Sequence, residues 1–192
     1  MTLFDLLFLL VFFATLAALI TAAVFSLRGD QATAGKTVLG VAIFLGIYLA
    51  VVIGVSLATP RRYVELNERH CYDDWCVAVV HATRGSPPEA VFQVQLRVSS
   101  DAKRVQQRAP DTKVFVEDAN GKRYAGWLVP GQPGFGTRIG PGESFETGFE
   151  FDVPANTQIA GVVVNHSTPG PGSFIIAEDS AIFHQPMLYK VK

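Results

Sequence analysis

The sequence predicts a two-helix transmembrane hairpin followed by an all-β antiparallel sandwich. Two observations support this prediction. Long apolar stretches fill most of the first 59 residues, and the rest of the chain consists of short alternating segments separated by turn residues. We therefore expect two domains, a helical hairpin in residues 1–59 and a sandwich in residues 60–192.

The second apolar stretch, Val38–Ala58, contains 21 residues and no charge. As an α-helix it would be about 31 Å long, which matches the roughly 30 Å hydrocarbon core of a bilayer. Pro60 follows it, and proline disfavours helical geometry in the residue before it. The sequence therefore predicts a spanning helix over about 38–58 and a short connection to the second domain.

The first apolar stretch, residues 4–27, contains a single charged residue before its end, Asp5. A cleaved signal peptide has a basic start and an apolar centre of about 7–15 residues. This stretch has no Lys or Arg at its start and is longer than that centre. The sequence therefore predicts an uncleaved helix over about 4–27, with a polar turn at 28–37.

Small residues recur at every fourth position in both stretches. They are Ala14, Ala18, Ala22 and Ser26 in the first, and Ala42, Gly46, Ala50, Gly54 and Ala58 in the second. Small side chains let helices approach closely in lipid, so we expect the two small-residue stripes to face each other. Two alternative interpretations remain. Small residues are common in membrane helices in any case, or one stripe contacts a partner protein.

The side of the membrane on which the second domain lies is predicted from opposing signals. Arg61, Arg62 and Arg69 outnumber Arg28 and Lys36 of the turn, and positive charge favours the cytoplasm. Closely spaced cysteines and a β-sandwich pattern are common outside the cytoplasm. We give the cysteines more weight and expect a multi-pass membrane protein with an extracytoplasmic β-domain.

Residues 60–192 contain about seven or eight strand signals at sandwich-like spacing. The segments are 63–69, 75–83, 90–99, 112–118, 122–127, 144–153, 159–165 and 181–191. In the third segment Phe92, Val94, Leu96 and Val98 alternate with polar residues, which indicates one buried face. Asn120-Gly121 favours a tight hairpin turn. An immunoglobulin-like sandwich is the fold that this pattern predicts.

Two loops rich in glycine and proline, 130–142 and 168–172, are expected to be exposed. Such loops on a sandwich often form binding edges. We also expect the basic run Lys103, Arg104 and Arg108 to be a solvated loop rather than a nucleic-acid site.

The stretch from His70 to Cys76 (HCYDDWC) is the most distinctive in the chain. If two strands meet there, Cys71 and Cys76 lie opposite each other and can form a disulfide. Two alternatives remain open. His70, Cys71, Cys76 and His81 together offer zinc or copper ligands, although the spacing matches no standard finger. A redox pair is the other, although the C-x-x-C spacing is missing.

Several stretches resemble uncharacterised bacterial membrane-anchored envelope proteins with an immunoglobulin-like, telokin-like domain. They are Val116–Tyr124 (VEDANGKRY), Gly140–Ser144 (GPGES), Phe151–Pro154 (FDVP), His70–Cys76, 174–176 and 179–186. The resemblance spans most of residues 63–191, and its motifs are turns and strand starts. It implies the fold and an envelope location, and it assigns no catalytic residue.

The composition gives little sign of catalysis or of nucleic-acid binding. The chain has 16 Lys and Arg against 17 Asp and Glu, so it lacks the excess of positive charge that is typical of nucleic-acid-binding proteins. No nucleophile elbow, zincin motif or phosphate loop is present. The acidic pairs at 73–74, 117–118 and 178–179 are interpreted as turn residues.

The predicted function is therefore a membrane-anchored β-sandwich binding or scaffolding module of the cell envelope, not an enzyme. The alternative is a copper- or zinc-handling envelope protein that uses the cluster at 70–81. We expect no cofactor and assign no catalytic, cofactor-binding or metal residue, only a disulfide between Cys71 and Cys76. Expected partners are membrane lipid and a protein at the β-domain loops or a small-residue stripe.

Overall fold

The computed structural model describes residues 3–72, 74–85, 91–166, 171–176 and 181–191. The chain divides into two compact units. The first contains Met1–Pro60 and Pro169–Gln185, and the second contains Arg61–Thr168 and Pro186–Lys192.

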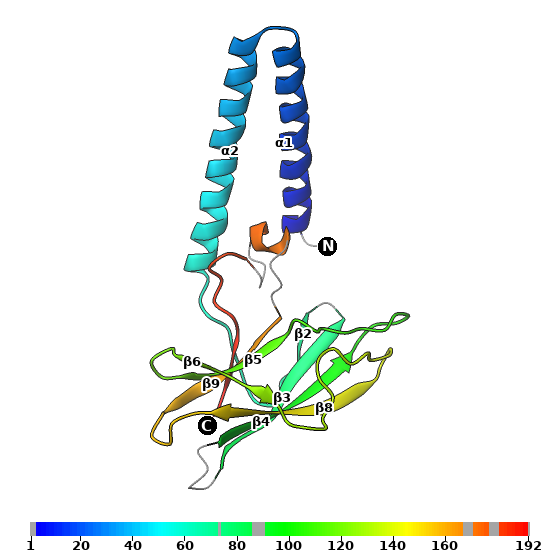
Figure 1. The fold of residues 1–192 in the computed structure, drawn as a ribbon, viewed down its shortest axis with the longest axis vertical. Coiled ribbons are helices and arrows are strands. Elements are labelled where there is room, and N and C mark those ends of the chain that lie inside the picture. The colour runs from blue at the N-terminus through cyan, green and yellow to red at the C-terminus, as the bar shows by residue number, and fades with distance from the viewer. Residues whose placement is uncertain (1–2, 73, 86–90, 167–170, 177–180, 192) are drawn as a thin grey trace. The chain divides into compact units, whose positions relative to one another are not determined.

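The first unit contains two long helices, α1 (Leu3–Leu27) and α2 (Gln31–Ala58), joined by a three-residue turn (Figure 1). Helix α2 begins seven residues earlier than the sequence predicted. The Asp30 side chain caps it by accepting a hydrogen bond from the Thr33 backbone N–H at 3.0 Å. Most of the expected polar turn is therefore the first turns of this helix.

The two helices pack along a seam that differs from the predicted one. Ala34, Val52 and Ser56 are the buried residues of α2, whereas all five members of its small-residue stripe are exposed. A step of four residues turns a helix about 40° beyond a full turn, so a stripe with this spacing winds away from any straight neighbour. The prediction that the stripes face each other is therefore wrong for α2, although Ala22 of α1 is buried.

Both helices are long and apolar enough to cross a membrane. Their mean hydropathy is 2.7 and 2.8, and most of their large apolar side chains are exposed. Tyr48 of α2 donates a hydrogen bond to the Phe174 carbonyl at 2.8 Å. This bond ties the 3-10 turn η1 (Pro171–Phe174) to the helix within the same unit.

The second unit is a sandwich of two five-stranded sheets. One sheet has the order β1-β10-β9-β5-β6 and the other has the order β2-β3-β4-β8-β7. The strands of the first are β1 (Tyr63–Val64), β10 (Leu188–Lys190), β9 (Ile159–Asn165), β5 (Lys113–Asp118) and β6 (Arg123–Ala125). Those of the second are β2 (His70–Tyr72), β3 (Trp75–Arg84), β4 (Val91–Ser100), β8 (Ser144–Asp152) and β7 (Trp127–Leu128).

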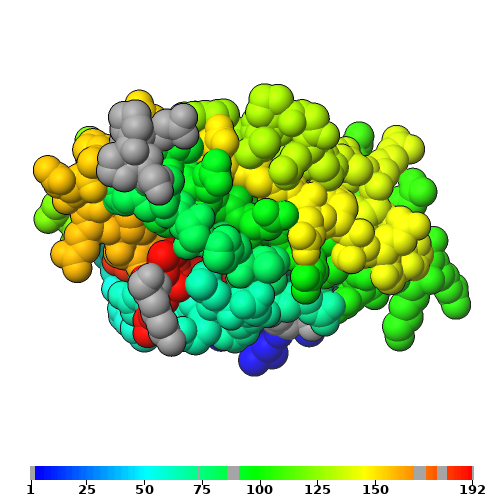
Figure 2. All heavy atoms as spheres, turned by 90° about the horizontal axis from the view of Figure 1, so that it is seen from below, coloured from blue at the N-terminus to red at the C-terminus, as the bar shows by residue number. Residues whose placement is uncertain are grey.

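The predicted sandwich of antiparallel strands is therefore present, with one parallel pair between β1 and β10. The predicted face of β4 belongs to the hydrophobic core, since Phe92, Val94, Leu96 and Val98 are all buried in it. In Figure 2 the chain around residues 125–150 (yellow-green and yellow) and the chain around 155–165 (orange) lie toward opposite ends of the visible face.

Three predicted strands differ from the observed ones. The segment 63–69 is a strand only at its first two residues, and 181–191 only at Leu188–Lys190. The segment 122–127 splits at Gly126, because β6 pairs with β5 in one sheet and β7 pairs with β8 in the other. The segment 122–127 passes from one sheet to the other, and the local alternation of apolar and polar residues does not reveal such a crossing.

Candidate functional site

The most distinctive stretch of the sequence forms a short hairpin between β2 and β3. Cys71 and Cys76 are directly opposite in its register and are joined by a disulfide. Cys76 is fully buried, and the Asp101 carboxylate lies 3.9 Å from the Cys71 sulfur. The structure therefore contains the expected disulfide between Cys71 and Cys76.

The alternative of a metal site at residues 70–81 is not supported. Both sulfurs belong to the disulfide, so neither offers the thiolate that copper or zinc requires. His81 lies five residues beyond Cys76 on β3, which corresponds to about 16 Å along an extended strand. Among the described residues, the potential ligand groups that lie close together are Cys71, Cys76 and Asp101, and neither His70 nor His81 is among them.

Aromatic side chains of this hairpin pack against residues of the other sheet and of the segment that follows it. The Tyr72 hydroxyl donates to the Val164 carbonyl of β9 at 3.0 Å. The Trp75 ring stacks on His166 at a centroid distance of 5.3 Å, and His166 Nδ1 lies 2.8 Å from the Thr112 hydroxyl. The arrangement packs the two sheets together, and we assign it a structural role.

Replacing both Cys71 and Cys76 with serine should lower the free energy of unfolding by about 2 kcal/mol, because the short closed loop limits the entropy that the crosslink removes. Urea unfolding of the full-length protein in detergent measures this change. Reduction of the wild-type protein should give the same shift. An unchanged unfolding midpoint after complete reduction would contradict the prediction.

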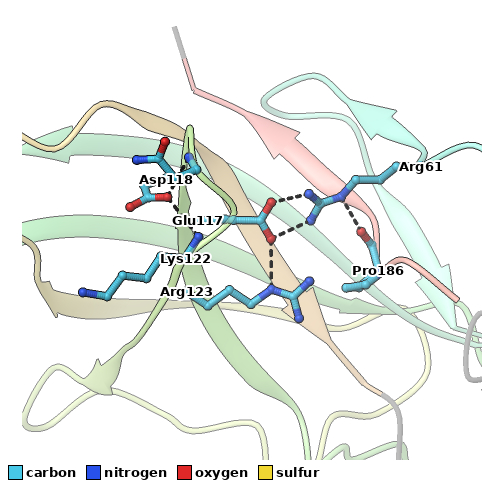
Figure 3. Close-up of polar contacts among 7 residues, drawn as sticks. Arg61, Glu117, Asp118, Lys122, Arg123 and Pro186 are labelled. Atoms are coloured by element: carbon cyan, nitrogen blue, oxygen red, sulfur yellow. Dashed lines mark hydrogen bonds and ion pairs between the residues drawn. The ribbon is translucent and has the colours of Figure 1, made fainter. Parts of the chain in front are cut away.

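A second arrangement surrounds Glu117 of β5 (Figure 3). Arg61 approaches its carboxylate with both terminal nitrogens, and Arg123 Nε donates to it at 2.9 Å. Arg61 Nε also donates to the Pro186 carbonyl at 2.8 Å. We refer to Arg61, Glu117, Arg123 and the Pro186 carbonyl as the Glu117 cluster.

Strand pairing places these residues. Val114 and Val116 point into the core, so Glu117 lies on the outer face of its sheet, where Gly161 of β9 and Arg123 of β6 are its neighbours. Its side chain is nevertheless only 7% exposed, and that of Arg61 is 13% exposed. The cluster therefore buries a carboxylate between two guanidinium groups.

The charge of Glu117 is strongly favoured. The hydrogen bond from Arg61 is the largest cause that lowers its pKa, and Arg123 adds to it, while burial opposes both. The carboxylate therefore stays ionised at neutral pH and is unsuited to donate a proton. The cluster connects Arg61, just after the helical segment, with Pro186, where the last segment of the chain enters the sandwich.

An open hollow of about 500 Å³ adjoins the Glu117 cluster. Its cationic side chains are already compensated, because Arg61 binds Glu117 and Lys190 lies over the Tyr63 ring and 4.0 Å from Glu65. The hollow thus has little charge left for an anionic ligand.

Sequence reasoning missed the Glu117 cluster. It interpreted Glu117 and Asp118 alike as turn residues, which is correct for Asp118 alone. The Asp118 carboxylate accepts hydrogen bonds from the backbone N–H groups of Asn120 and Lys122, both at 2.9 Å, and Gly121 adopts the expected positive φ. The β-strand run KVFVED ending in two acids was the available signal, since its last outward position is Glu117.

The predictions of exposure for the two loops and for the basic run agree with the structure to different extents. Lys103, Arg104 and Arg108 are exposed, as expected. The loop 130–142 is partly buried through Phe135, which stacks on Phe149 at 5.2 Å. Residues 168–170 of the other predicted loop lie outside the described residues, as do Asp73 and the acidic pair 178–179.

Comparison with known proteins gives structural neighbours alone. No family model matches the chain. No curated protein matches it either. An uncharacterised β-sandwich protein from Clostridium difficile 630 aligns with 70% of this chain and 96% of its own, at 12% identity and a TM-score of 0.45. MPT63, a secreted protein from Mycobacterium tuberculosis, aligns with 56% of this chain and 92% of its own, at 17% identity and a TM-score of 0.41.

Proposed function

We propose that this protein is a membrane-anchored β-sandwich binding or scaffolding module of the cell envelope, with its sandwich on the extracytoplasmic side. The observation that supports it most is the first unit. Its helices of 25 and 28 residues expose most of their large apolar side chains, which favours lipid around them. A helix from the core of a soluble protein would bury those side chains.

The disulfide supports an extracytoplasmic location of the sandwich. The disulfide between Cys71 and Cys76 uses both cysteines of the chain, and such crosslinks persist in oxidising compartments. The connection between the helices and the sandwich is short, since only four residues separate Ala58 of α2 from Tyr63 of β1. This short tether supports a position of the sandwich close to the membrane. Arg61 and Arg62 in this tether suit anionic head groups.

The proposed partners are membrane lipid and a protein. The exposed small-residue stripe of α2 leaves open space beside Gly46 and Gly54, which suits close approach of another helix. The sandwich loops are the other proposed contact. We propose that the module acts by binding and not by catalysis.

Cysteine labelling in intact cells tests the proposed topology. In a background with Cys71→Ser and Cys76→Ser, single cysteines are introduced at Lys103, an exposed sandwich residue, and at Gln31, beside the turn between the helices. A membrane-impermeant maleimide should label Lys103→Cys in intact cells and Gln31→Cys only after permeabilisation.

The reverse labelling pattern would place the sandwich in the cytoplasm and overturn the proposed side. Recovery of the full-length protein in the soluble fraction after cell breakage would overturn the membrane anchor itself. Wild-type protein should label only after reduction, which tests the disulfide in the same cells.

A further inference from the structure

A polar hollow lies on the outer face of the sheet that contains β3, β4, β8 and β7. Strand register aligns one row of outward residues across all four strands: Thr83, Gln93, Glu150 and Trp127. The next row consists of His81, Gln95 and Gly148. With strands about 4.8 Å apart, the first row extends over about 14 Å.

Gly148 contributes no side chain to the second row, and the side chain of Gln132 occupies the space directly above it. Gln132 folds over it from the loop 130–142, and its side-chain oxygen accepts a hydrogen bond from the Gly148 backbone N–H. The space that remains is about 170 Å³. It is lined by Gln132, by the second row, and by Thr83, Gln93 and Glu150 of the first row, and Trp127 lies outside this lining. A hollow of this volume has room for several water molecules, and therefore for a small polar group such as one sugar ring.

The lining offers hydrogen-bond donors and acceptors side by side. Gln93 and Gln95 use their amide nitrogens to bind Glu150 at 3.1 Å and Glu146 at 3.2 Å, so their oxygens remain as acceptors. Within the described part of the chain, the side chains of Thr83 and His81 and the side-chain amide nitrogen of Gln132 have no hydrogen-bond partner. A ligand whose groups both donate and accept, such as a polyol, matches this set.

Trp127 adds an apolar surface at the edge of the hollow. It is 46% exposed and directly opposite Glu150, which lines the hollow, so their Cβ atoms lie about 5 Å apart. An exposed indole offers a flat face with a polar edge. Such a face stacks on the C–H side of a pyranose while neighbouring polar groups bind its hydroxyls.

The same features disfavour two other ligands. A peptide that adds as a β-strand needs free backbone groups, but the hollow is centred on β4 and β8, which pair with neighbours on both sides. An anionic polymer needs uncompensated cations. Arg97 on this face is paired with Glu146 at 2.9 Å, and Glu150 adds a negative charge to the hollow.

We propose that this hollow, together with Trp127, binds a neutral glycan chain, with one ring in the hollow and an adjacent ring on the indole. The proposal rests on the proposed function as a binding module and names its ligand class. The glycan site lies on the sheet opposite the one that holds the Glu117 cluster.

Isothermal titration calorimetry of the full-length protein tests the proposal. The detergent must lack a sugar head group, and lauryldimethylamine oxide meets this requirement. The probes are chitohexaose, cellohexaose and maltohexaose, with dextran sulfate as the anionic comparison. At least one neutral hexasaccharide should bind with a Kd below about 1 mM. It should also shift the emission of exposed Trp127, whereas Trp75 is buried.

Variants separate the glycan site from general effects on the fold. Trp127→Ala should weaken binding about tenfold, and Trp127→Phe should retain most of it. Gln132→Ala should weaken binding about fivefold, because it removes a donor at the hollow. Tyr63→Ala is the matched control, since Tyr63 is an exposed aromatic residue (55%) on the other sheet, and it should bind like wild type.

Three outcomes would overturn the proposal: no saturable binding of any neutral probe up to about 10 mM, unchanged affinity in Trp127→Ala, or binding of dextran sulfate alone. None of these affects the proposed membrane anchor, which is tested separately by cysteine labelling and fractionation. A protein that labels as expected but binds no hexasaccharide would retain the proposed function and lose only the glycan site.

Discussion

Replacing Glu117 with alanine is expected to lower the free energy of unfolding of the sandwich by about 3 kcal/mol, since removal of one partner from a buried ion pair leaves an uncompensated charge. Arg61 is only 13% exposed and would lose its counter-ion, whereas Arg123, at 38%, can turn toward water. Urea unfolding followed by tryptophan fluorescence measures this change, because both tryptophans lie in the sandwich.

The pH dependence provides a second readout of the same residue. The pKa of Glu117 is lowered from 4.5, chiefly by the hydrogen bond from Arg61. Its ionisation therefore contributes stability that is complete above pH 4.5 and is lost as the pH falls below this value. Glu117→Gln should be less stable than wild type at neutral pH, and the difference should shrink as the pH falls through this range.

Glu146 offers a matched control for the Glu117 prediction. It pairs with Arg97 at 2.9 Å, but both side chains are about half exposed. Glu146→Ala should therefore cost less than about 1 kcal/mol. Equal effects of the two substitutions, or a difference between Glu117→Gln and wild type that does not depend on pH, would show that burial of the Glu117 cluster has no energetic consequence.

The sequence predicted the larger elements because each has a strong local pattern. The helices follow from uninterrupted apolar length, and β4 follows from the alternation at Phe92, Val94, Leu96 and Val98. The disulfide followed from the same kind of argument, since a tight turn between two strands places Cys71 opposite Cys76. In each case the decisive residues are neighbours in the sequence.

The features that the sequence did not reveal depend on distant segments. Glu117 is buried because Arg61, 56 positions earlier, and Pro186 close over it. The hollow at Gly148 exists because Gln132 folds back from a loop. Strand β10 is recognisable only once β9 and β1 lie on either side of it. A pattern of local alternation contains no information on such contacts.

Replacing Gly161 with alanine is expected to destabilise the sandwich by about 3 kcal/mol, because the new methyl group cannot fit. A Cβ atom at this position would lie 2.2 Å from the Tyr189 carbonyl oxygen, which belongs to the backbone of β10. Strand β10 would have to move away from β9. Tyr189, whose buried hydroxyl donates to the Val77 carbonyl at 3.0 Å, opposes this movement.

Urea unfolding again measures the effect of Gly161→Ala, with Gly136→Ala as the control. The nearest atom to a Cβ at Gly136 is 3.9 Å away, so this variant should stay within about 0.5 kcal/mol of wild type. Gly161 is also the register neighbour of Glu117, and displacement of β10 would move the Pro186 carbonyl away from Arg61. The double variant with Glu117→Ala should therefore lose less stability than the two single losses added together, whereas strict additivity would mean that β10 and the Glu117 cluster are energetically independent.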